Sequence, residues 1–103
     1  MTMPYGLTDI ELQKLTTALS SAEGVKKAIL YGSRAKGNYK PFSDIDITLV
    51  GDSLSRHDLN AVSRTLDDLL LPYQIDLSLY DTLKNDDLIE HINHYGVEIF
   101  VRK

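Results

Sequence analysis

Residues 31–49 read YGSRAKGNYKPFSDIDITL, and the second half of this stretch decides the fold. Within residues 43–50, the side chains of residues 44–49 alternate strictly between polar and apolar. The apolar positions are Ile45, Ile47 and Leu49, and the polar positions are Asp44, Asp46 and Thr48. Alternation with a period of two predicts a half-buried strand, here with carboxylates along its open face.

The residues before this strand predict a second strand and a sharp turn. Residues 26–31 contain an unbroken apolar run, which predicts a largely buried strand that Gly32 ends. Residues 33–38 form a short segment with small and basic side chains, and we expect it to begin a helical turn. A loop with glycine and proline then leads to the strand that carries the carboxylates.

Helix and strand patterns alternate through the rest of the chain. Capping boxes predict helix starts at Thr8, with Glu11 three residues later, and at Ser55, with Asp58 three residues later. The predicted helices span residues 8–20, 55–70 and 85–95, and the remaining predicted strands span residues 74–79 and 97–101.

The apolar side of each helix is expected to face the core. Ile10, Leu70 and Tyr95 are expected to belong to these buried stripes. Gly96 follows the last helix in the position where a left-handed glycine commonly ends a helix.

This order of elements predicts an α/β (α+β) domain of two layers, in which helices cover one face of a mixed sheet. The face that carries the carboxylates is expected to stay open. A length of 103 residues is typical of one domain, so residues 1–103 are predicted to form a single domain. Residues 1–6 are expected to be a short, loosely held lead-in.

The composition excludes several classes of protein. The chain has no cysteine, which excludes a disulfide framework, a thiolate nucleophile and a cysteine-based zinc site. The formal net charge of −4 argues against nucleic acid as the primary partner, because such binding depends on clustered Lys and Arg. No secretion signal or membrane-spanning run is recognisable, so we expect a soluble, cytoplasmic protein without membrane contact.

Three carboxylates lie at polar positions of the predicted strands. Asp44 and Asp46 share one side of a strand, and Asp76 has the equivalent position on another strand. If these strands are neighbours, the carboxylates converge and repel each other unless a cation lies between them. Hard divalent cations prefer such oxygen ligands. Asp81 is an alternative to Asp76, but it follows its strand and has the pattern of a turn or cap.

A second feature is suited to phosphate. Gly32 lets the main chain approach a phosphate closely, and Ser33 offers a hydroxyl and an N–H group at a helix start. Arg34 or Lys36 could neutralise further phosphate charge. A phosphate-binding segment together with a carboxylate cluster indicates metal-assisted phosphoryl transfer.

Each feature alone has an ordinary explanation. Gly-Ser after a strand is usually a turn, and Asp-x-Asp is more often a solvated strand face. Aspartate is disfavoured in strands, however, and three aspartates occur here in phase. His91 and His94 are interpreted as part of a solvated helix face rather than as a metal pair, and Tyr39 as a loop residue that could touch the nucleotide.

The order of these residues resembles a known family signature. Gly32-Ser33, ten intervening residues and Asp44-Ile45-Asp46 match G-S-x10-D-x-D, which is typical of DNA polymerase β-like nucleotidyltransferases. The longer string from Tyr31 to Leu49 is similar to the minimal nucleotidyltransferase (MNT) domains of prokaryotes. The resemblance implies a two-layer nucleotidyltransferase fold for nearly the whole chain.

The resemblance also implies a reaction and a partner. In this family three carboxylates bind two magnesium ions, and these roles fall on Asp44, Asp46 and Asp76. Asp76 would also help to activate the attacking hydroxyl, while Gly32 and Ser33 would hold the β- and γ-phosphates of ATP. Small MNT proteins resemble antitoxins that transfer AMP onto a tyrosine of a HEPN ribonuclease toxin, so a HEPN-type toxin is the implied partner.

Two alternatives remain open. One is nucleotidyl transfer to a small molecule such as an aminoglycoside, or to an RNA 3′ end, although such relatives usually carry extra domains. The other is a binding-only antitoxin with a vestigial site, and the intact carboxylates argue against it.

Overall fold

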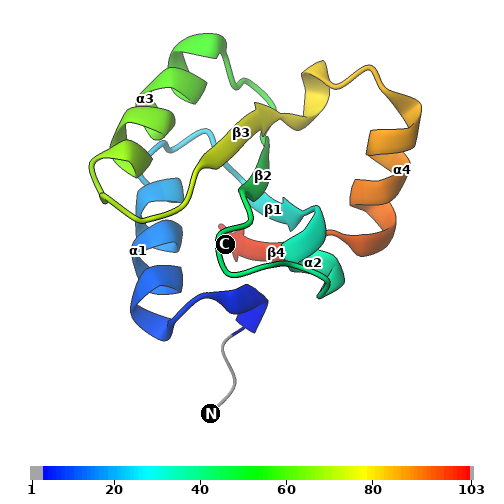
Figure 1. Cartoon of the computed structure of the whole chain (residues 1–103). Helices are drawn as coiled ribbons and strands as arrows, with labels where there is room; N and C mark the ends of the chain where they lie inside the picture. The colour runs from blue at the N-terminus through cyan, green and yellow to red at the C-terminus, as the bar shows by residue number, and fades with distance from the viewer. Residues whose placement is uncertain (1–3, 103) are drawn as a thin grey trace.

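A mixed sheet organises the molecule. The computed structural model describes residues 4–102, in which four strands pair in the order β3-β2-β1-β4 (Figure 1). Strand β1 is antiparallel to both β2 and β4, whereas β2 and β3 are parallel, as expected for a mixed sheet. The strands are β1 Lys27–Tyr31, β2 Ile45–Val50, β3 Ile75–Leu79 and β4 Val97–Val101.

The predicted helices are all present, and both capping boxes form. The Thr8 hydroxyl accepts the Glu11 N–H at 3.1 Å, and Ser55 and Asp58 bond in the same reciprocal way. Within residues 4–102, none of the helices is both long enough and apolar enough to cross a membrane. The helices are α1 Asp9–Leu19, α2 Ser33–Lys36, α3 Arg56–Asp67 and α4 Asp86–Tyr95, with short 3-10 turns η1 Pro4–Gly6 and η2 Tyr80–Thr82.

Helices α1 and α3 lie side by side and cover one face of the sheet (Figure 1). The apolar positions of β2 are buried beneath them, as the alternation predicts. The predicted α/β (α+β) arrangement around a mixed sheet is therefore confirmed. Its core includes Leu15 and Leu19 of α1, Leu30 of β1, Ile45, Ile47 and Leu49 of β2, and Val62 and Leu66 of α3.

Helix α4 packs against the opposite side of β1. Its buried residue is Ile92, and a side chain at Gly96 would meet Ile29. Ile29 alternates with the core residues Ala28 and Leu30, so it points to the other face of the sheet. Helix α4 thus narrows the open face but leaves Asp76 exposed.

Three residues that were expected in buried stripes are exposed. Ile10, Leu70 and Tyr95 have exposed fractions of 66%, 87% and 43%. Ile10 lies about 140° around α1 from the buried Leu15, because successive residues of a helix are rotated by about 100°. Leu70 follows the end of α3 with a φ of 54°, and this left-handed conformation turns it away from the core. The Tyr95 ring lies beside Lys36 instead.

Gly96 ends α4 in a different way from the one expected. Its φ of −62° and ψ of 143° are extended rather than left-handed, because the chain passes directly into β4. A Cβ atom there would lie 2.3 Å from the Ile92 carbonyl oxygen and 2.6 Å from Ile29 Cγ2. Glycine is therefore needed at this position for space and not for φ.

The N-terminal lead-in is held more firmly than expected over its described part. The turn η1 is anchored where the Tyr5 carbonyl accepts a hydrogen bond from Arg34 Nη1 at 2.8 Å. The rest of the predicted lead-in, residues 1–3, lies outside the described residues.

Replacing Gly96 by alanine is expected to lower the free energy of unfolding by about 1–3 kcal/mol, because the added methyl group must displace Ile29 and the main chain of α4. Gly24→Ala is the matched control. A Cβ atom at Gly24 meets only Leu54 Cδ2, at 3.2 Å, so a loss of less than about 1 kcal/mol is expected. Urea unfolding measures both variants, and equal stability would contradict the packing constraint at Gly96.

The capping box of α3 is expected to lose its effect in acid. The Ser55 main-chain N–H and hydroxyl bond the Asp58 carboxylate and lower the pKa of Asp58 below its ordinary value of 3.8. Because folding favours the ionised form, the stabilisation is complete above the ordinary pKa and is lost as the pH falls through the lowered one. The wild-type chain should therefore be more stable than Asp58→Asn near neutral pH, and the difference should shrink below about pH 4. Unfolding free energies of both proteins are measured across this pH range. A difference between them that stays constant would contradict the prediction.

Candidate active site

The strand register brings two of the three predicted carboxylates together. Asp46 of β2 pairs directly with Asp76 of β3 on one side and with Tyr31 of β1 on the other. Directly paired residues point to the same face of a sheet, which here is the face opposite the helical core. Asp81, the alternative to Asp76, lies in η2 beyond the other end of β3.

Asp44 does not lie on the strand as predicted. Strand β2 begins at Ile45, whose N–H donates to the Gln74 carbonyl at 2.9 Å, and Asp44 is the exposed residue before it. Within residues 4–102, no three carboxylate, imidazole or thiol side chains are already arranged around a common metal position. The sheet therefore fixes Asp46 and Asp76, whereas Asp44 belongs to the loop.

The acidic pair has no cationic partner among the described residues. The ion pairs found there, Lys26 with Asp52 and Lys27 with Glu98, lie toward the other ends of β1 and β2. Partial burial, followed by the negative charges of Asp76 and Asp44, raises the pKa of Asp46 above its ordinary value. Carboxylate oxygens are hard ligands, and their excess negative charge here suits a divalent cation. The donor chemistry thus fits the magnesium that the family resemblance implies.

Gly32 brings the main chain against Asp46. It follows β1 with a φ of 77° and a ψ of −157°, a conformation that residues with a Cβ atom rarely adopt. A Cβ atom at Gly32 would lie 2.3 Å from Asp46 Oδ2. Glycine is therefore required both for the backbone conformation and for the space that the Asp46 carboxylate occupies.

Ser33 and Lys36 begin and end the short helix α2. The Lys36 N–H donates to the Gly32 carbonyl at 3.1 Å, and the first N–H groups of a helix have no partner within it. Ser33 thus lies where an anion can be bound. Lys36 is exposed, and its Nζ atom lies 5.1 Å from the centroid of the Tyr95 ring on α4.

Arg34 is placed differently from the phosphate-binding role predicted for it. Its side chain is only 1% exposed. Nε and Nη2 donate to the Ser43 carbonyl at 3.1 and 2.8 Å, and Nη1 donates to the Tyr5 carbonyl at 2.8 Å. The guanidinium also lies over the rings of Tyr39 and Tyr73, at 5.4 and 4.6 Å from their centroids. These contacts join η1, the loop between α2 and β2, and the segment before β3 that carries Tyr73.

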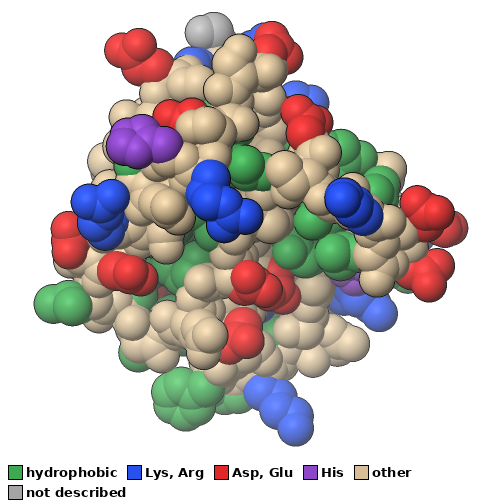
Figure 2. All heavy atoms as spheres, turned by 90° about the horizontal axis from the view of Figure 1, so that it is seen from above, with side chains coloured by type: hydrophobic (Ala, Val, Ile, Leu, Met, Phe, Trp, Pro, Cys, Tyr) green, Lys and Arg blue, Asp and Glu red, His purple; other side chains and the backbone are tan. Residues whose placement is uncertain are grey.

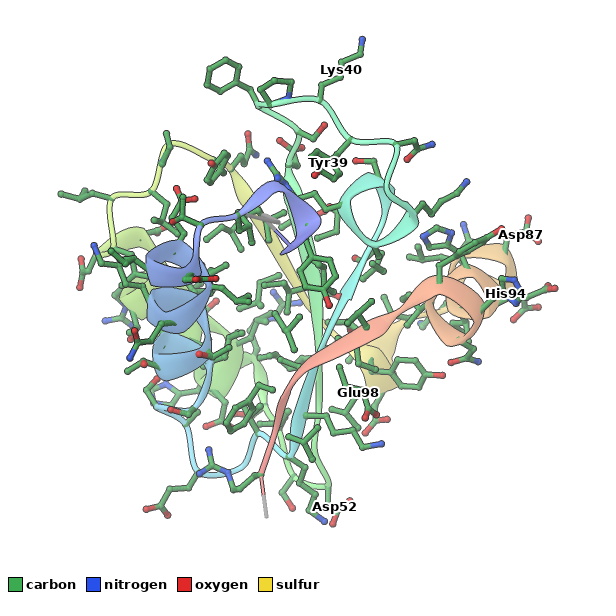
Figure 3. All side chains as sticks on the ribbon, turned by 90° about the horizontal axis from the view of Figure 1, so that it is seen from below. Tyr39, Lys40, Asp52, Asp87, His94 and Glu98 are labelled. Atoms are coloured by element: carbon green, nitrogen blue, oxygen red, sulfur yellow. The ribbon has the colours of Figure 1, made fainter. Side chains whose placement is uncertain are left out.

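The contacts of Arg34 bear on Asp44 and Tyr39. Ser43, whose carbonyl accepts two bonds from Arg34, immediately precedes Asp44, so Arg34 holds the loop from which Asp44 projects. Tyr39, predicted as a nucleotide contact, is half-buried and packs on Arg34. Figure 3 shows Tyr39 beneath the loop, whereas the neighbouring Lys40 points away from the body of the molecule.

His91 is a candidate site residue that the sequence pattern does not identify. The pattern assigns it to a solvated helix face, but its Nε2 atom accepts a hydrogen bond from the Gly32 N–H at 3.0 Å. Its ring also meets the Tyr31 ring edge-on, with centroids 6.3 Å apart. The donor is a main-chain group 59 residues away, so no local pattern reveals the contact. His94 is exposed, as interpreted.

Charged side chains of both signs are interspersed on one face of the molecule. Figure 2 shows Asp and Glu beside Lys and Arg on the face that it presents, with no broad basic area there. This distribution is in keeping with the net charge of −4. That nucleic acid is not the primary partner stays a prediction.

A family model matches most of the chain. The family is described as "Polymerase beta, Nucleotidyltransferase", and residues 13–103 match it. No curated protein matches the sequence.

Several solved structures share the fold. A toxin–antitoxin crystal structure with AMP-PNP is 20% identical, has a TM-score of 0.70, and matches 89% of this chain and 74% of its own. The toxin–antitoxin MntA-HepT is 18% identical, with a TM-score of 0.66 and coverage of 92% and 74%. The tri-AMPylated Shewanella oneidensis HEPN toxin in complex with MNT antitoxin gives 18% identity, a TM-score of 0.64 and coverage of 88% and 70%. At these identities the shared property is the fold.

Arg34 is expected to contribute to stability rather than to phosphate binding. Arg34→Met deprives the carbonyls of Tyr5 and Ser43 of their donors, so we expect the free energy of unfolding to fall by about 3 kcal/mol. Lys36→Met, an exposed site on the same helix, is the control and should change it by less than about 0.5 kcal/mol. Urea unfolding compares the two. An Arg34→Met variant of full stability with weakened ATP binding would instead restore the phosphate role.

Proposed function

The chain belongs to the polymerase β nucleotidyltransferase family, and from this premise we propose that it transfers AMP from ATP onto a tyrosine hydroxyl of a HEPN-type toxin. The observation that carries the proposal is the pairing of Asp46 with Asp76 beside Gly32 and Ser33. A carboxylate pair without a cationic partner thereby adjoins a helix start suited to phosphate.

The carboxylates are assigned to two magnesium ions. Asp46 and Asp76 offer oxygen ligands from neighbouring strands, and Asp44 offers a third from the loop before β2. The raised pKa of Asp46 supports this assignment, because its causes include two like charges that a cation would offset. When bound, magnesium neutralises the triphosphate and lowers the pKa of the acceptor hydroxyl.

The proposed reaction is an in-line substitution at the α-phosphorus of ATP. The acceptor oxygen forms a bond to this phosphorus while the bond to the pyrophosphate oxygen breaks, and pyrophosphate leaves. The Asp76 carboxylate takes the proton of the acceptor hydroxyl. Ser33 and the first N–H groups of helix α2 hold the departing β- and γ-phosphates. Lys36 is the remaining cation for phosphate charge on α2, because Arg34 is bound to main-chain carbonyls.

A protein acceptor is supported by the position of the carboxylates and by the fold neighbours. Asp76 is exposed on the open face of the sheet, so a hydroxyl on the surface of another protein can approach it. One neighbour is a toxin–antitoxin with AMP-PNP, and another is a tri-AMPylated HEPN toxin in complex with MNT antitoxin. Their composition supports an adenine nucleotide and a HEPN-type partner for this chain.

Asp46→Asn and Asp76→Asn are each expected to lower the rate of AMP transfer by at least about a hundredfold, because each removes a charge that the reaction requires. The measurement is the label on the toxin after incubation with Mg²⁺ and ATP labelled at the α-phosphate. Asp81→Asn removes an exposed carboxylate outside the pair and should transfer at the wild-type rate. Full transfer by either site variant, or equal loss in all three variants, would contradict the assignment.

Stability measurements make loss of activity interpretable. The raised pKa of Asp46 means that folding disfavours its ionised form. This carboxylate therefore destabilises the fold once the pH exceeds the ordinary pKa of an aspartate. Asp46→Asn should therefore unfold at the same temperature as the wild type, or at a higher one, in the absence of metal. An inactive variant that is also unstable would leave its activity loss attributable to unfolding.

The same assay separates the two alternatives. A stable complex of the two proteins without label would favour the binding-only antitoxin. Label on an aminoglycoside or on an RNA 3′ end, with none on the toxin, would favour transfer to those acceptors.

A further inference from the structure

His91 links helix α4 to the phosphate segment, by which we mean Gly32 and Ser33. The Gly32 N–H donates to His91 Nε2 at 3.0 Å. The half-buried imidazole meets the Tyr31 ring edge-on at 6.3 Å and lies 5.3 Å from the Tyr95 ring. Because aromatic rings restrict the imidazole on two sides, its acceptor nitrogen is held toward Gly32.

The direction of this hydrogen bond defines the state of the imidazole. An N–H donor requires a lone pair on Nε2, so the ring that accepts it is neutral and carries its proton on Nδ1. His91 therefore acts on Gly32 as a hydrogen-bond acceptor and not as a cation.

Gly32 transmits this contact to the acidic pair. Its Cα atom packs so closely on Asp46 that a Cβ atom would lie 2.3 Å from Oδ2. His91 thus holds the peptide between Tyr31 and Gly32, while Gly32 itself lies against Asp46. A rotation of this peptide would move Ser33 relative to Asp46, and misplacement of a reacting group by about 1 Å can cost about a hundredfold in rate.

We propose that His91 is a positioning residue for nucleotidyl transfer: its neutral imidazole fixes the Gly32 N–H and thereby sets the position of Ser33 relative to Asp46. This role rests on the proposed function. A second contact connects helix α4 with helix α2, which follows Gly32: Lys36 Nζ lies 5.1 Å from the centroid of the Tyr95 ring. Helix α4 therefore braces the phosphate segment at its start and helix α2 at its end.

Substitutions at His91 separate the hydrogen bond from the packing. His91→Phe keeps an aromatic ring near Tyr31 and Tyr95 but removes the acceptor, whereas His91→Gln keeps an acceptor oxygen. His94→Phe is the matched control, because it makes the same change on the same helix without a hydrogen bond to the phosphate segment. His94 is exposed and lies on the outer side of α4 (Figure 3).

The first measurement is the hydrogen-exchange rate of the Gly32 amide, followed by NMR. We expect exchange to be at least about tenfold faster in His91→Phe, closer to wild type in His91→Gln, and unchanged in His94→Phe. This measurement requires no enzymatic activity. Wild-type exchange of the Gly32 amide in His91→Phe would overturn the proposal.

The second measurement compares affinity for AMP-PNP with Mg²⁺, and kcat and KM for AMP transfer. We expect His91→Phe to bind AMP-PNP more weakly and to lower kcat about ten- to a hundredfold, with partial recovery in His91→Gln. Tighter AMP-PNP binding by His91→Phe would mean that His91 competes with phosphate for the Gly32 N–H, and unchanged affinity and kcat would mean that it positions nothing. Either result overturns the proposal. If the wild-type chain transfers no AMP, the proposed function fails, and amide exchange with AMP-PNP affinity still decides the role of His91.

Discussion

A buried guanidinium that has no carboxylate partner among the described residues is the constraint on which the candidate site depends. Desolvating a charge is costly, so each donor of Arg34 must find an acceptor. The acceptors are the carbonyls of Tyr5 and Ser43 and, at 3.5 Å, that of Pro41, and aromatic rings cover the guanidinium plane. The contacts of this one side chain therefore bring together η1, the loop between α2 and β2, and the segment before β3. Ser43, whose carbonyl accepts two of these bonds, directly precedes Asp44.

The acidic pair shows the opposite arrangement. Asp46 and Asp76 lie side by side on two neighbouring parallel strands and pair with no cation of the described residues; partial burial and then the charge of Asp76 raise the pKa of Asp46. Repulsion of this kind costs stability, and natural proteins tolerate such a cost mainly at functional sites. The sheet supplies the rigidity that keeps the two carboxylates in register. The chain belongs to the nucleotidyltransferase family, and the proposed role of the pair as metal ligands accounts for this arrangement.

Helix α4 contacts the candidate site in a way that its own sequence does not predict. It belongs neither to the core beneath α1 and α3 nor to the family signature, yet it reaches the signature at Gly32 through His91 and at Lys36 through Tyr95. The face of the sheet that carries the carboxylates is therefore open at Asp76, while helix α4 packs against it beside β1. In the proposed reaction, a phosphate segment held in this way would need little reorganisation when its ligand binds.

Local regularities in the sequence determined the helices, the strands and the identity of the carboxylates. Period-two alternation around Asp46 and the capping boxes at Thr8 and Ser55 involve only neighbouring residues, so both could be read without a structure. Only the tertiary structure decided the burial of Arg34 and the bond between Gly32 and His91. Both depend on carbonyl and N–H groups that every residue type shares, and only folding brings these groups to side chains distant in the sequence.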